Sequence, residues 1–101
     1  MRTIAIHEKG GVTWWVEFPP EHYRVNGLSC VIVTAHWWTD RGEGWADIRV
    51  TVGPGATKGG WAHVGDRVGL SLLPRQIRSD VARHIISVMD ARAKEDTDEK
   101  K

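Results

Sequence analysis

The sequence predicts an α+β domain, with four or five mostly antiparallel strands and one C-terminal helix packed on one face of the sheet. Three observations support this fold class. Apolar and polar residues alternate in several short segments before Pro74, as in half-buried strands. Glycine-rich or Asn-Gly turns separate these segments. After Pro74, apolar residues recur at helical spacing instead.

The 101-residue chain is long enough for one core, and we expect a single domain over residues 1–93 and a disordered charged tail over 94–101. The 14 basic and 13 acidic residues nearly balance, so no overall field favours nucleic acid or membrane. No window approaches the roughly 20 apolar residues of a membrane span, and the start lacks an apolar signal core. We therefore expect a cytoplasmic protein that does not bind membranes.

The first hairpin is predicted from two alternating segments, Arg2–Glu8 and Val12–Phe18, on either side of Lys9-Gly10-Gly11. A three-residue loop would place Ile6 opposite Trp14 and keep the apolar residues on one face, so we prefer it to a two-residue Gly-Gly turn. The opposite face would then carry His7, Trp15 and Glu17.

The second hairpin is predicted from Leu28–Trp38 and Trp45–Val52, joined by residues 39–44. Setting Trp38 opposite Trp45 makes one face entirely apolar and pairs His36 with Asp47 on the other. Cys30 lies in the apolar run, and we expect it to be a buried, inert thiol. Pro19-Pro20 ends the strand before this hairpin, and a short strand at Tyr23–Val25 is also considered.

The remaining chain is predicted to contain a flexible loop at Gly53–Gly60, an irregular stretch to Asp66 and a fifth short strand at Arg67–Leu73. Pro74 is expected to open the C-terminal helix. His84 projects onto the apolar stripe of this helix, where we expect a core-edge histidine. The stripe consists of Ile77, Val81, Ile85, Val88 and Met89.

The helix would cover the apolar face of the sheet and leave the other face exposed. Each Trp-Trp pair on a strand would then place one indole in the core and one outside. Exposed indoles beside arginine, histidine and carboxylates are typical of interaction hot spots. We therefore predict a binding face that contains Trp15, His36, Trp38, Trp45, Asp47 and Arg49.

These residues favour a small non-enzymatic protein-interaction module, acting as an inhibitor, an adaptor or a small subunit, with a protein partner or a second copy of itself bound to the Trp/Arg-rich face. The first alternative is stacking of single-stranded nucleic acid on the same indoles, with Arg24, Arg41 and Arg49 at the phosphates. The second is a small enzyme in which Asp47 orients His36 as a general base. We assign no catalytic residue, no metal ligand and no cofactor. The alternative to a binding role for the indoles is a structural one, in which Trp38 and Trp45 form a cross-strand aromatic pair.

The opening hairpin, Ile4-Ala5-Ile6-His7 with Trp15-Val16-Glu17-Phe18-Pro19, resembles the first two strands of HicB-type antitoxins. The likeness covers under a fifth of the chain. The next part departs from that family, because Asn26-Gly27 leads into another predicted strand rather than a helix. The resemblance implies no function for this chain.

Overall fold

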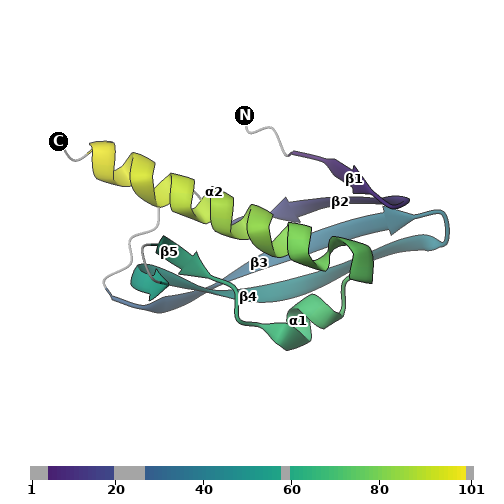
Figure 1. Ribbon diagram of the computed structural model, residues 1–101, viewed down its shortest axis with the longest axis horizontal. Helices are drawn as coiled ribbons and strands as arrows, with labels where there is room; N and C mark the ends of the chain where they lie inside the picture. Colours follow the sequence, from purple (N-terminus) through teal and green to yellow (C-terminus); the bar gives the residue numbers. More distant parts are fainter. Residues whose placement is uncertain (1–4, 20–26, 58–59, 100–101) are drawn as a thin grey trace.

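The computed structural model describes residues 5–19, 27–57 and 60–99, which form one sheet, a short helix and a long C-terminal helix (Figure 1). The five strands are antiparallel, and each pairs with the next one along the chain. The predicted α+β class and antiparallel sheet are therefore confirmed. The elements are β1 (His7–Lys9), β2 (Val12–Glu17), β3 (Ser29–Thr39), β4 (Gly42–Thr57), β5 (Gly60–His63), α1 (Arg67–Ser71), the 3-10 turn η1 (Arg75–Ile77) and α2 (Arg78–Glu99).

The core lies between α2 and the face of the sheet that the helix crosses (Figure 1). Residues four apart on the helix point at the sheet, as the predicted stripe requires. They meet alternate residues of β2, β3 and β4, which are almost all apolar. The buried side chains of this core include Val12, Trp14, Val16, Val33, Ala35, Ile48, Val50, Val52, Ala62, Leu73, Ile77, Val81, Ile85 and Met89.

The first hairpin has a two-residue turn, so the predicted three-residue loop is wrong. Gly10 and Gly11 both have positive φ, 59° and 81°. A two-residue turn with positive φ at both positions matches the right-handed twist of the two strands that it joins. His7 therefore pairs with Trp14 and lies on the helix-covered face, whereas Ile6 is 68% exposed. Only three residues of β1 are paired, and the alternation further upstream does not set the register.

The second hairpin is shifted by two residues from the predicted register. Its turn is Asp40-Arg41, with Thr39 opposite Gly42, and Glu43 and Gly44 belong to β4. A shift of two residues keeps every side chain on its predicted face but changes its neighbours. Trp38 therefore lies opposite Glu43 rather than Trp45.

Gly44 lies within β4, opposite Trp37, and the ring of Trp37 lies over its backbone. A Cβ atom added at Gly44 would be 2.5 Å from Cζ2 of Trp37, which no real side chain tolerates. The glycine thus leaves room for an indole, and it is not the turn residue that its sequence context suggests.

The second half of the chain departs most from prediction. The expected loop from Gly53 is largely strand, because β4 continues to Thr57 before β5 returns. The expected strand at Arg67–Leu73 is mostly helix α1, because the Asp66 carboxylate accepts a hydrogen bond from the Gly69 amide and caps the first turn.

The C-terminal helix begins after Pro74, as predicted, with η1 as its first turn. Its backbone continues to Glu99, and disorder of segment 94–101 in solution stays a prediction. The strand considered at 23–25, together with Arg24, lies outside the described residues. Among residues 5–19, 27–57 and 60–99, no helix is long and apolar enough to cross a membrane.

Candidate functional site: the open sheet face

The sheet face opposite α2 is called the open face, and it consists of the outward residues of β2, β3 and β4. Strand alternation brings all six predicted binding residues onto the open face. Helix α1 contacts β4 at its edge. Trp38 and Trp45 are 61% and 65% exposed, which is unusual for indoles. The outward residues are Thr13, Trp15 and Glu17 on β2; Cys30, Ile32, Thr34, His36 and Trp38 on β3; and Glu43, Trp45, Asp47, Arg49 and Thr51 on β4.

An aromatic row crosses the middle of the open face. His36 lies between Trp15 on one neighbouring strand and Trp45 on the other. The rings of Trp15 and His36 are stacked, with centroids 5.1 Å apart and an interplanar angle of 7°. The row is therefore ordered along its Trp15 side, while Trp45 and the neighbouring Trp38 present most of their surface to solvent.

The polar partners on the open face differ from those predicted. His36 Nε2 lies 3.0 Å from Glu17 Oε1, and the Thr34 hydroxyl donates to Asp47 Oδ1 at 2.7 Å. The predicted direct pairing of His36 with Asp47 is wrong because the register places Asp47 opposite Thr34. The arrangement that the enzyme hypothesis required, with Asp47 orienting His36, is thus not present.

The other end of the open face is apolar. Ile32 is exposed there, as is Cys30, which alternates with Val31 and Val33, and Leu28 is exposed just before β3 begins. The predicted burial of Cys30 is wrong: a continuous apolar run contributes alternate residues to both faces, and only the odd-numbered ones reach the core.

A second cluster, which the sequence did not reveal, lies under the opposite face at the start of α2. The ring of His7 stacks on Trp14 at 4.3 Å, and its centroid is 4.7 Å from that of His84. His7 Nε2 is buried and has no hydrogen-bond partner among the described residues. Burial, and secondarily the nearby His7, lower the pKa of His84 below its ordinary value. His7 therefore does not belong to the open face, where the three-residue loop would have placed it.

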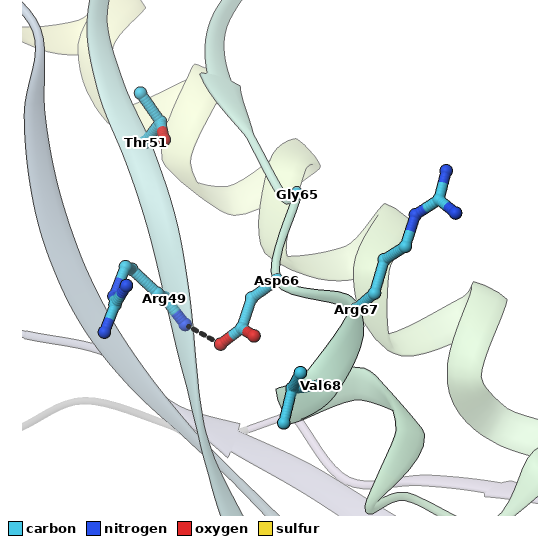
Figure 2. Close-up of a pocket in the computed structure, with 6 residues that line it drawn as sticks. All are labelled: Arg49, Thr51, Gly65, Asp66, Arg67 and Val68. Carbon is cyan, nitrogen blue, oxygen red and sulfur yellow. Dashed lines mark hydrogen bonds between the residues drawn. The ribbon is translucent and has the colours of Figure 1, made fainter.

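A shallow groove of about 440 Å³ runs along the edge of β4, beside α1 (Figure 2). Asp66 lies in it and accepts hydrogen bonds from the backbone amides of Arg49 and Gly69, at 3.0 and 2.9 Å. The hydrogen bond from the Arg49 amide, and after it the one from the Gly69 amide, hold the pKa of Asp66 below its usual range. Figure 2 shows the side chains of Arg49 and Arg67 directed away from the carboxylate. The Asp66 carboxylate thus covers the strand edge at the Arg49 amide, and both arginines line the groove.

No group of three or more His, Cys, Asp and Glu side chains within the described residues is arranged to hold a metal ion. His7 and His36, two histidines considered from the sequence, lie on opposite faces of the sheet. Comparisons with models of protein families, with curated proteins and with solved structures found no match, so the open face is interpreted from its own chemistry.

Proposed function

We propose that this protein is a non-enzymatic interaction module of the cytoplasm that binds a protein partner through the open face. The observation that carries the proposal is the exposure of Trp38 and Trp45, together with Ile32, on one side of a sheet. A fully buried aromatic residue removes about 150–250 Å² from solvent, so two largely exposed indoles alone form a substantial apolar patch. Exposed indoles gathered at one end of a sheet face, with polar residues around them, are typical of interaction sites.

The composition of the open face also supports a protein partner. Tryptophan and arginine are the residues most enriched at the energetic centres of interfaces, and Trp45 and Arg49 lie on the same side of β4. Three carboxylates, those of Glu17, Glu43 and Asp47, surround the indoles. Charges around an apolar centre select a partner with a complementary pattern rather than any apolar surface.

The second candidate function is binding of single-stranded nucleic acid. It is favoured by the row of Trp15, His36 and Trp45, which has the form of a stacking platform for bases. The same three carboxylates oppose it, because they would face the phosphates. Titration with a short oligonucleotide, followed by tryptophan fluorescence at low and high salt, separates the two candidates. A quenching that disappears at high salt would support nucleic acid.

The direct test of the proposed function places a photo-crosslinking benzoylphenylalanine at position 45 in the full chain, in cells that express the protein. Ultraviolet irradiation should give discrete protein adducts, because Trp45 is near the centre of the predicted contact. The control carries the same residue at position 87, since Ser87 is an exposed residue of α2, on the other side of the molecule.

Adducts that form at position 45, fail at position 87 and diminish when Trp38→Ala is added would support the proposal. The absence of adducts at position 45, or an equal pattern at both positions, would overturn it. An adduct with a second copy of the chain counts as a protein adduct here.

A further inference from the structure

The charges of the open face are arranged so that the face complements itself. We propose that its partner is a second copy of this chain, and that the two copies pack face to face about a two-fold axis that passes between Asp47 and Arg49. The inference rests on the proposed function and names the partner of the same surface. Its argument comes from the register of β3 and β4, from the available area and from the covered strand edges.

Asp47 and Arg49 are two residues apart on β4, so both project from the open face as neighbours. A two-fold axis in the interface plane, perpendicular to the strands, reverses the strand direction of the second copy. Asp47 of each copy then faces Arg49 of the other, which is the reciprocal pattern of an isologous interface. Within the described residues, Arg49 forms no side-chain ion pair, and Asp47 uses only Oδ1, for the Thr34 hydroxyl. Both groups can therefore accept an intermolecular partner.

The same axis places no like charges opposite each other on β3. Thr34 lies opposite Asp47 and Ile32 opposite Arg49, so the axis sets Thr34 against Ile32 of the second copy. Sheets that pack face to face are about 10 Å apart and rotated by about 30°, so this alignment holds best near the axis. Further out, the exposed Trp38 at one end of the face comes to lie over the end of the second copy that carries Leu28.

The other simple arrangement is disfavoured by charge. A two-fold axis parallel to the strands and centred on β3 would place β2 over β4 of the second copy. Because Glu17, Thr34 and Asp47 form one row across the three strands, this arrangement would set Glu17 against Asp47. Two carboxylates facing each other in an interface repel, so the axis across the strands is selected.

The area of the open face is sufficient for a dimer. The 11 residues of β3 span about 36 Å at roughly 3.3 Å per residue, and neighbouring strands add about 4.8 Å each. Side chains corrugate this surface and increase its accessible area. Three such strands give a footprint of about 500 Å² per copy, so two copies cover on the order of 1,000 Å², the lower bound of specific interfaces.

Edge-to-edge pairing through β4 or β5 is obstructed. The Asp66 carboxylate accepts a hydrogen bond from the Arg49 amide at the edge of β4. The Asp90 carboxylate accepts hydrogen bonds from the amides of Trp61 and Ala62 in β5. Covered edges resist the addition of another strand. Within the described part of the chain, the edges of β4 and β5 are thus covered at these amides, whereas Trp38 and Trp45 on the open face are mostly exposed.

The test is a charge-reversal cycle, measured by sedimentation equilibrium of the full chain. The unsubstituted protein should form dimers. Asp47→Arg and Arg49→Asp should each weaken dimerisation by about tenfold or more, because each places like charges opposite each other twice. The double variant, D47R with R49D, restores opposite charges and should dimerise to within about threefold of the unsubstituted protein. The charge-matched controls are Asp40→Arg in the β3–β4 turn and Arg75→Asp in η1, which should dimerise normally.

A protein that remains monomeric up to about 1 mM, the limit for a weak specific contact, would overturn the inference. So would a double variant that dimerises no better than the single ones, provided that circular dichroism shows it to be folded. If the protein stays monomeric while position 45 still crosslinks to other proteins, the second-copy inference fails and the proposed function stands. If neither dimers nor adducts form, both fail.

Discussion

The imidazole of His7 is stacked on the indole of Trp14, with ring centroids 4.3 Å apart and an interplanar angle of 19°. This contact attaches the first hairpin to the core and brings His7 to the ring of His84 on α2. Lys9 adds an ion pair to Asp80 of α2, with 2.8 Å between Nζ and Oδ2. The short strand β1 is therefore held by its neighbours on α2 as well as by its pairing with β2.

The burial of His84, and secondarily its contact with His7, predicts a loss of stability in mild acid. The pKa of folded His84 lies below its ordinary value of 6.5, so the unfolded chain binds the proton more tightly. Neutral His84 contributes to the free energy of unfolding in full above about pH 6.5, and this contribution is lost as the pH falls through the lower pKa of the folded state. Urea unfolding at pH 7.5 and pH 5.5 should show a lower free energy of unfolding at pH 5.5.

The variant that tests this pH effect is His84→Gln, which should reduce the difference in the free energy of unfolding between the two pH values, and the control is His63→Gln, at an exposed histidine outside the His7–His84 cluster. Asp66 and Asp80 do not contribute in this window, since both have pKa values below their ordinary 3.8. An unaltered pH dependence in His84→Gln would contradict the assignment.

Gly44→Ala should destabilise the protein by about 1–3 kcal/mol, because the new methyl group would overlap the ring of Trp37. Urea unfolding measures the effect. The neighbouring exposed substitution Glu43→Ala is the control and should stay within about 0.5 kcal/mol. If the steric explanation holds, a smaller side chain at position 37 should relieve the overlap, so Trp37→Leu should cost less in the Gly44→Ala background than alone.

Asp66→Ala should cost about 1–2 kcal/mol, because it removes a helix cap together with the acceptor of the Arg49 amide. Asp66→Asn should recover little of this loss. The two amides bond different carboxylate oxygens, and an asparagine would turn its NH2 group toward one of them. Chemical denaturation gives the free energies, and hydrogen exchange at the Arg49 amide should accelerate in both variants. Full stability of Asp66→Asn would show that one acceptor suffices.

Trp45→Ala and Trp38→Ala should change the stability of the isolated monomer by less than about 1 kcal/mol, since both side chains are mostly exposed. Trp14→Ala, in the core, should cost about 3–5 kcal/mol. Thermal and urea unfolding at a dilution that favours monomers measure all three. A large loss for Trp45→Ala would identify the indole as a structural element of the sheet and would weaken the proposed interface.

The alternation of side chains on β2, β3 and β4 is local information, and it correctly placed every predicted binding residue on one face. Register was not fixed by alternation, because a shift of two residues preserves the faces. The deciding features were the preference of Gly10-Gly11 for a two-residue turn and the room that Gly44 leaves for Trp37. The second of these is a contact between strands, and no pattern within one strand reveals it.

The region after Val52 was predicted least well for a related reason. Glycine and proline normally interrupt strands, yet β4 continues through Gly53, Pro54 and Gly55. Helix α1 has only five residues, too few for a helical period to emerge, and its start is identified by the capping role of Asp66. The cluster of His7 and His84 was missed because it depends on the turn that was assigned wrongly.

The strand order has a consequence for folding. Each strand pairs with the one made just before it, so the sheet can grow strand by strand as the chain leaves the ribosome, and the longest connection to be closed is residues 18–28. The helix that covers the core, α2, follows all five strands in the chain. Until it has been synthesised, the sheet exposes apolar residues on both sides, and this interval is when the nascent chain is most prone to aggregate or to need a chaperone.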